Sequence, residues 1–268
     1  MGTPRGMGRV DCEVQGAIAL VSLSHPAKFN AMSRAMWREL RALFEDLPAR
    51  PGLRCVILGG EGGHFCAGGD IAEYPAFRFD PAGLRDFHES EVWGGLEALL
   101  RCELPIVARI EGHCMGAGLE LASCCDIRIA AASARFGAPI ARLGFPMAPR
   151  EAQLVARAAG QATARELLLE AAVLDAPEMK ARGFLNRVVP DAEAAAQALA
   201  SARRIAALAP QAARLNKRTL RALEPVPAAP AQAEAALQAL VDQAYDYADS
   251  AEHREGITAF LAKRPPVF

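Results

Sequence analysis

Residues 112–122 read GHCMGAGLELA, and this stretch predicts how the chain passes from a strand into a helix. It follows PIVARI (105–110), an apolar and β-branched run that predicts a strand. Residues 116–124 predict a buried helix in which Glu120 is the single carboxylate. Because glycines let backbone N–H groups approach a ligand closely, this strand, turn and helix predict either a ligand site or a tight corner.

The same order of elements occurs earlier in the chain. CVILGG (55–60) predicts a strand buried on both faces, and it opens into the glycine-rich loop GGEGGHFCAGGD (59–70). Further strands are predicted at 17–23 and 126–132, and a helix at 81–101. This order predicts an α/β fold of stacked β-β-α units with a parallel component.

From about Pro149 onward the pattern is helical, and only LNRVV (185–189) predicts a strand. We therefore divide the chain into a core over 1–195 and a C-terminal helical region over 196–268. The apolar stripes of this helical region would pack either on the core or on another subunit.

Composition excludes several classes of protein. The chain has 268 residues, 52% of them hydrophobic and 23% charged, which is typical of a globular protein. The formal net charge of −1 gives no field that favours nucleic acid. No apolar stretch approaches the roughly 18–20 residues that cross a bilayer, and the first residues lack a signal-peptide pattern. We therefore expect a cytoplasmic protein without a nucleic-acid or membrane partner.

The cysteines and histidines do not form a recognisable site. Seven cysteines without a C-x-x-C pair argue against a disulfide framework, and five scattered histidines lack the spacing of metal ligands. We expect no metal. His113-Cys114 and His64-x-Cys66 are the nearest patterns to a metal or nucleophile pair, and packing or loop roles are the alternative.

The helix of the opening stretch can support proton transfer. The phosphate-binding P-loop, the dinucleotide fingerprint and the nucleophile elbow are all absent. Ala117 and Glu120 lie three residues apart, so on a helix they face the same side. One turn then offers an N–H to a carbonyl oxygen and a carboxylate to the neighbouring carbon. Alternatively, Glu120 is one partner of a buried salt bridge and the glycines allow close helix packing.

Several motifs in order resemble the crotonase superfamily, the enoyl-CoA hydratase/isomerase family. The resemblance runs from about residue 10 to the C-terminus. The matching segments are HPAKFNAMS, HFCAGGDI, IEGHCMGAGLELASCCDIRIAA, SARFGAPIARLGFP, ARGFLNRVVP and EGITAFLAKRPPVF. The resemblance implies a crotonase-like spiral of β-β-α units, with the C-terminal helices used to form a homotrimer or a dimer of trimers.

The resemblance also implies an acyl-CoA thioester substrate and no cofactor, because CoA is part of the substrate. Backbone N–H groups of Gly69 and Ala117 would stabilise the oxygen of a thioester enolate, and Glu120 would transfer the proton. Further family positions that lie along CoA are held here by Lys28, Ala67, Asp70, Ile71, Phe260 and Lys263. For the two lysines the alternative is a solvated side chain, and Asp70 could equally be a helix N-cap.

One departure from the family bears on the reaction. Hydratases of this family carry a second glutamate where this chain has Ile140. Arg142 is a cation, and Glu151 lies beyond the turn near Pro146, so we expect neither to replace it. Glu120 would then act alone, which favours an isomerase-type double-bond shift over 2-enoyl-CoA hydration of the β-oxidation type. An acyl-CoA decarboxylase, a thioesterase and a non-catalytic acyl-CoA binder are the alternatives.

Overall fold

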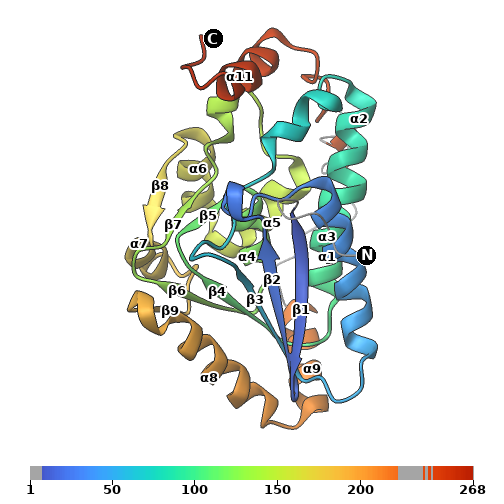
Figure 1. Ribbon diagram of the computed structural model, residues 1–268, viewed down its shortest axis with the longest axis vertical. Coiled ribbons are helices and arrows are strands. Elements are labelled where there is room, and N and C mark those ends of the chain that lie inside the picture. The colour runs from blue at the N-terminus through green and yellow to red at the C-terminus, as the bar shows by residue number, and fades with distance from the viewer. Residues whose placement is uncertain (1–7, 223–237, 239–240, 243, 268) are drawn as a thin grey trace.

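The computed structural model describes residues 8–222, 238, 241–242 and 244–267 (Figure 1). A six-stranded sheet in the order β1-β2-β3-β4-β6-β9 forms its centre, and a smaller sheet has the order β5-β7-β8. In the large sheet only the β1–β2 pair is antiparallel. The strands are β1 (Arg9–Gln15), β2 (Ile18–Ser24), β3 (Cys55–Gly60), β4 (Ile106–Ile110), β5 (His113–Met115), β6 (Ile127–Ala131), β7 (Arg135–Gly137), β8 (Val173–Asp175) and β9 (Arg187–Val189).

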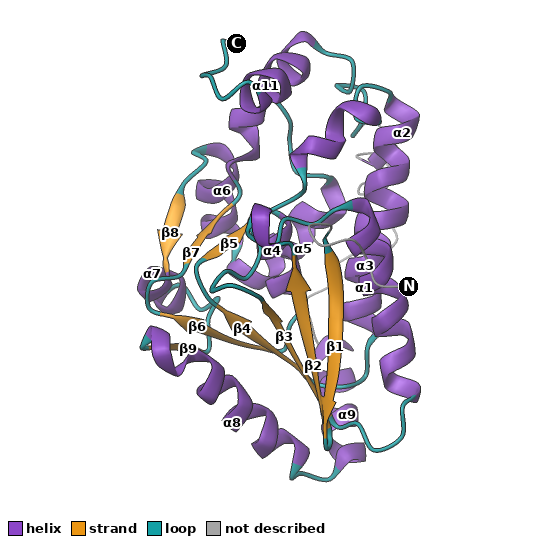
Figure 2. Cartoon of the chain, in the orientation of Figure 1, coloured by secondary structure: helices purple, strands orange, loops and turns teal. Residues whose placement is uncertain are grey.

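Helices cover both faces of the large sheet (Figure 2). The α-helices are α1 (Arg34–Asp46), α2 (Pro81–Asp86), α3 (Trp93–Arg101), α4 (Ala117–Ser123), α5 (Pro149–Ala159), α6 (Gln161–Leu169), α7 (Ala176–Ala181), α8 (Ala194–Ala206), α9 (Pro210–Ala222) and α11 (Ala251–Leu261). The 3₁₀-helical segments are η1 (Pro26–Lys28), η2 (Leu47–Ala49), η3 (Ile71–Ala76), η5 (Pro139–Leu143) and η6 (Asp191–Glu193), and η4 (Phe87–Val92) is a π-helical segment. The predicted α/β class with parallel strands is therefore confirmed.

Strand β3 shows how the two faces are filled. Successive side chains of a strand point to opposite faces. Val56 and Leu58 belong to the main core, where α1 and α3 also pack, whereas Ile57 belongs to a second cluster with Ala198 and Ala202 of α8. The strand is buried on both faces, as its continuous apolar run predicted. Helix α8 thus packs on the core, which was one of the two options for the C-terminal stripes.

The second half of the chain contains one strand more than the sequence predicts. The prediction of a single strand after Pro149 is wrong, because β8 pairs there with β7. Three residues are too few to show a strand periodicity. In the last part of the predicted helical region, residues 223–237, 239–240 and 243 lie outside the described residues, and α11 is its described long helix. Among the described residues, no helix has both the length and the apolar character needed to cross a membrane.

Parallel pairing brings the two glycine-rich segments together. Strands β3 and β4 are parallel neighbours, so the loops that follow them leave the same edge of the sheet. The Cys66 N–H donates to the His113 oxygen at 2.8 Å, and the Met115 N–H donates to the Cys66 oxygen at 2.9 Å. The loop after β3 therefore runs beside β5, directly before α4.

Gly118 of α4 packs against this loop with no room for a side chain. A Cβ at Gly118 would lie 2.5 Å from the Cys66 carbonyl oxygen, which is backbone and cannot move aside cheaply. We expect Gly118→Ala to lower the free energy of unfolding by about 1–3 kcal/mol, measured by urea denaturation. Gly94→Ala in α3 is the matched control, because its nearest neighbour is the end of the Arg41 side chain. The control should be neutral or stabilising by up to about 1 kcal/mol, and equal losses in both variants would contradict the prediction.

Candidate active site

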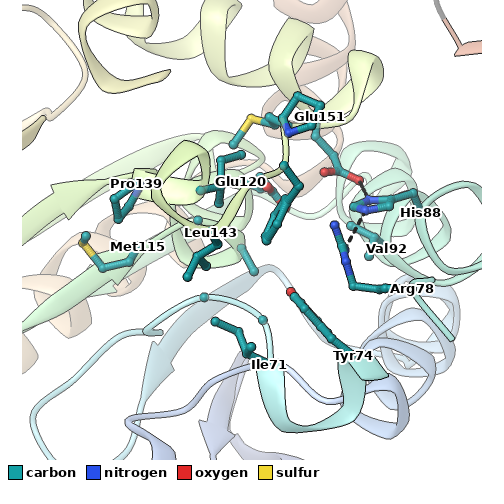
Figure 3. A pocket seen from close by; sticks show the side chains of 18 of the residues that line it. Ile71, Tyr74, Arg78, His88, Val92, Met115, Glu120, Pro139, Leu143 and Glu151 are labelled. Carbon is teal, nitrogen blue, oxygen red and sulfur yellow. Dashed lines mark hydrogen bonds and ion pairs between the residues drawn. The ribbon is translucent and has the colours of Figure 1, made fainter. Parts of the chain in front are cut away.

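A cavity of about 360 Å³ opens where the two glycine-rich segments meet (Figure 3). This volume falls in the range of small-molecule sites. Its wall comes from the loop after β3, η3, η4, α4, η5 and the start of α5, and Phe260 of α11 also contributes. Most of the lining is apolar, and its ionisable side chains are Tyr74, Arg78, His88, Glu120, Arg142 and Glu151.

Gly69 and Ala117 both line this cavity, as the sequence predicted for an oxyanion hole. The bridge to Met32 uses the Asp70 N–H and the Gly68 oxygen, so the Gly69 N–H points away from Met32. Ala117 is the first residue of α4, where backbone N–H groups lack a partner within the helix. Gly116 precedes it with φ of 48°, a left-handed value that favours glycine.

Glu120 lies one turn further along α4, in the same cavity and 6% exposed. Burial raises the pKa of its carboxyl well above the usual range, and the charge of Glu151 raises it further. No described cation stabilises its ionised form. The alternative role of Glu120, in a buried salt bridge, is therefore not found in the described part of the chain. The Glu120 carboxyl therefore holds its proton to a higher pH than an exposed glutamate does.

Glu151 is in the same cavity, and our expectation that it lies out of reach beyond the turn is wrong. The turn through Pro146 brings the start of α5 back against α4, which α5 contacts directly. Glu151 is 3% exposed, and burial raises the pKa of its carboxyl to about 8 against the lowering effect of Arg78. The cavity therefore contains two buried carboxyls that influence each other's protonation.

His88 connects Glu151 to Arg78. The His88 Nδ1 atom lies 2.7 Å from Glu151 Oε1, and its Nε2 atom lies 3.1 Å from Arg78 Nη1. A guanidinium only donates, so Nε2 accepts and Nδ1 carries the hydrogen that it donates to Glu151. Burial, together with the Arg78 charge, holds the pKa of His88 well below its usual value. The imidazole is thus neutral and held in one tautomer.

The other predicted substrate-binding residues fall into two groups. Ala67, Ile71, Ile140 and Phe260 line the cavity, although the Phe260 side chain is half exposed. Lys28, Asp70 and Lys263 do not line it.

Those three residues lie outside the cavity wall in different settings. Lys28 Nζ donates to both Asp70 oxygens, at 2.7 and 2.6 Å. The Asp70 carboxylate also accepts from the Ala72 N–H, so its predicted N-cap role is confirmed. Lys263 is exposed after α11. Their predicted contacts with CoA remain predictions.

The cysteine patterns favour packing over chemistry. Cys66 and Cys114 are fully buried, and burial raises the pKa of both thiols, to about 12 for Cys66. Both thiols therefore stay protonated and cannot act as nucleophiles or metal ligands in this state. His64 and His113 stack at 4.7 Å between ring centroids, beside Phe29.

Sequence reasoning did not identify Tyr74, Arg78, His88 or Glu151 as site residues. For Glu151 a signal existed, since it lies three and four residues before the buried Leu154 and Val155 of α5 and so occupies their apolar stripe. For Tyr74, Arg78 and His88 the sequence offered no comparable signal.

Comparisons with known proteins agree on one family. The family model described as "Enoyl-CoA hydratase/isomerase" matches residues 13–268. A probable enoyl-CoA hydratase of Rhizobium meliloti is 33% identical, over 96% of each chain.

Two solved structures share the fold. An enoyl-CoA hydratase/carnithine racemase from Magnetospirillum magneticum has a TM-score of 0.78 at 38% identity, covering 98% of this chain and 96% of that one. A methylmalonyl-CoA decarboxylase in complex with 2-nitronate-propionyl-CoA has a TM-score of 0.83 at 28% identity, covering 97% and 98%. The predicted crotonase-like fold is thereby confirmed.

The raised pKa of Glu151 predicts a pH-dependent stability. The folded protein holds this proton up to about pH 8, whereas the unfolded chain releases it near 4.5. The free energy of unfolding should therefore fall as the pH rises through this window, by at most about 1.4 kcal/mol per pH unit for one group. We expect Glu151→Gln to reduce this fall, measured by urea denaturation at about pH 5 and about pH 8.

The surface variant Glu45→Gln is the control, because Glu45 forms only an exposed pair with Arg41. It should leave the pH dependence as in the wild type. A Glu151→Gln protein that loses as much stability as the wild type over this window would contradict the prediction.

Proposed function

Since the chain belongs to the enoyl-CoA hydratase/isomerase family, we propose that its cavity holds the acyl part of a CoA thioester and forms an enolate there. The backbone N–H groups of Gly69 and Ala117 would donate to the thioester oxygen as it gains negative charge. Removing one such preorganised donor typically lowers the reaction rate by about 10²–10³-fold. Glu120 would remove the proton from the carbon next to the thioester.

The observation that carries this proposal is the shared cavity of Gly69, Ala117 and Glu120. An N–H at the start of α4 and a carboxyl one turn later lie on one face of the helix. Burial favours the protonated carboxyl, so Glu120 can return the proton that it has taken.

The first candidate reaction is a double-bond shift of the isomerase type. It needs one residue that removes a proton at one carbon and delivers it at another, and Glu120 suffices for that. Ile140 lines the cavity where hydratases of the family carry a second acid, and its side chain cannot transfer a proton. No cofactor beyond the CoA of the substrate takes part in this proposal.

The second candidate is hydration of a 2-enoyl-CoA, and Glu151 is the observation that favours it. Hydration must activate a water molecule and also protonate the carbon next to the thioester. Glu120 and Glu151 could divide that work. Glu151 has a pKa of about 8, and the hydrogen bond donated by His88 stabilises its ionised form, so it can accept a proton from water while Glu120 keeps its own.

We further propose that the protein works in the cytoplasm. The C-terminal region is proposed to assemble it as a homotrimer or a dimer of trimers. The exposed Phe260 and Lys263 of that region would then reach CoA, and Lys28 would lie near its phosphates.

Two variants separate the candidates. Glu120→Gln should lower turnover by about 10²–10⁴-fold, with CoA-thioester binding retained. Glu151→Gln should lower hydration of crotonyl-CoA by a similar factor, but should change conversion of a 3-enoyl-CoA to its 2-enoyl isomer only severalfold. The measurements are absorbance assays of both reactions with purified protein.

Three results of the same assays would count against the proposal. Binding without turnover of any thioester in the wild type would identify a non-catalytic binder. Release of CO₂ or free CoA, unaffected by Glu120→Gln, would point to decarboxylation or hydrolysis that does not use this carboxyl. Turnover of crotonyl-CoA that survives Glu151→Gln would remove the basis for dividing hydration between the two residues.

A further inference from the structure

We infer that the substrate's acyl group carries a carboxylate of its own, which the buried Arg78 guanidinium binds inside the cavity. The ligand class is a CoA monothioester of a short dicarboxylic acid. This inference rests on the proposed acyl-CoA function of the same cavity and adds the chemistry of the acyl group.

Arg78 is a fully buried cation. Its side chain is 0% exposed, yet it lines the cavity beside Glu151 and His88 (Figure 3). Removing a charge from water costs several kcal/mol unless an opposite charge or strong hydrogen bonds compensate. Buried arginines are therefore normally paired with a carboxylate.

The hydrogen-bond acceptors of Arg78 are all neutral in the part of the chain that the structure describes. Its guanidinium donates to His88 Nε2 at 3.1 Å, to the Tyr247 hydroxyl at 3.1 Å and to His253 Nε2 at 3.4 Å. His253 Nδ1 in turn donates to the Ala248 oxygen at 2.8 Å. Both imidazoles thus present a lone pair to Arg78 and a hydrogen away from it.

Neither histidine nor a neighbouring carboxyl supplies the missing negative charge directly. Burial lowers the pKa of His253 to about 4, so its ring is neutral like that of His88. The nearest carboxyl along the network, Glu151, is separated from Arg78 by the His88 ring, and its pKa of about 8 leaves it mostly protonated at neutral pH. Glu89 is already paired with Arg150 at 3.1 Å. Within the part of the chain that the structure describes, no carboxylate therefore forms an ion pair with Arg78.

The guanidinium can still bind an anion at its edge. The rings of Tyr74 and Phe145 pack against it, with centroids 4.4 and 4.2 Å from the Arg78 Cζ atom. These centroids lie only 6.1 Å from each other, so the rings cover adjacent sides of the guanidinium and not its two opposite faces. Of its five N–H groups, three have acceptors among the described residues, which leaves two. A carboxylate can accept two such hydrogens in one plane, the strongest arrangement available to arginine.

Tyr74 relates this cation to the proposed thioester oxygen. Its hydroxyl lies against Gly69, at the position that a Cβ would occupy, and its ring packs on Arg78. One tyrosine side chain thus spans the distance between the proposed oxyanion hole and the guanidinium. An acyl chain that begins at Gly69 and ends at Arg78 is therefore short.

A purely structural role is the competing explanation. Arg78 joins η3 to the C-terminal segment through Tyr247 and His253, so it also holds the wall of the cavity in place. A structural role would affect ligands of every charge equally. Recognition of a carboxylate would affect only anionic acyl groups, and this difference defines the experiment.

The test measures binding by isothermal titration calorimetry, so it does not depend on turnover. Glutaryl-CoA is compared with 5-methylhexanoyl-CoA, in which an isopropyl group of similar shape replaces the carboxylate. The wild type should bind glutaryl-CoA at least about tenfold more tightly. Arg78→Met should weaken glutaryl-CoA binding by at least about tenfold and change binding of the neutral thioester by less than about threefold.

Two further variants complete the design. Arg78→Lys keeps the charge without the fork of parallel donors and should lie between the wild type and Arg78→Met. Arg101→Met removes an exposed cation, whose side chain is 77% exposed, and should leave both affinities unchanged.

The results decide the inference in each case. Equal affinity of the wild type for both thioesters, or equal losses for both in Arg78→Met, would overturn it while leaving the proposed acyl-CoA function intact. Failure of either thioester to bind would overturn that function and the inference together. If Arg78→Met does not fold, the wild-type comparison alone gives the answer.

Discussion

The close contact between the loop after β3 and β5 is the constraint on which the site depends. Two backbone hydrogen bonds of Cys66 hold these segments together, and Gly118 lets α4 come against the same carbonyl. The contact places Gly69 beside the start of α4, so Gly69 and Ala117, which are distant in the sequence, line one cavity. A side chain at Gly118 would separate the segments, and with them the two N–H groups. The backbone geometry of the site therefore depends on how closely these segments pack in the fold.

The sequence predicted this part of the molecule because its signals are local. Strands β3 and β4 show as continuous apolar runs, and the glycines mark the turns that follow them. Glu120 is recognisable in the sequence because burying a carboxylate in an apolar helix costs free energy and so indicates a specific role. When two residues are three or four positions apart in a helix, their spacing in the sequence already shows that they lie on the same face.

The remainder of the site depends on contacts between distant segments, which no local pattern records. His88 and Glu151 are 63 residues apart, and Arg78 and His253 are 175 residues apart. The turn at Pro146 indicated only that the chain changes direction, and the direction in which α5 then runs is set by its packing on α4. The three-residue strand β8 escaped prediction for the same reason, since its pairing with β7 defines it.

The charges of the cavity connect substrate choice with proton transfer. The charge of Glu151 raises the pKa of Glu120, whereas Arg78 lowers the pKa of Glu151. A ligand carboxylate on Arg78 would cancel that lowering effect and add its own repulsion. Both carboxyls would then hold their protons more firmly when such a ligand is bound. An anionic acyl group would in this way favour Glu151 as a proton donor, whereas a neutral one would leave Glu151 closer to ionisation. The identity of the acyl group would then influence which carboxyl acts as acid and which as base.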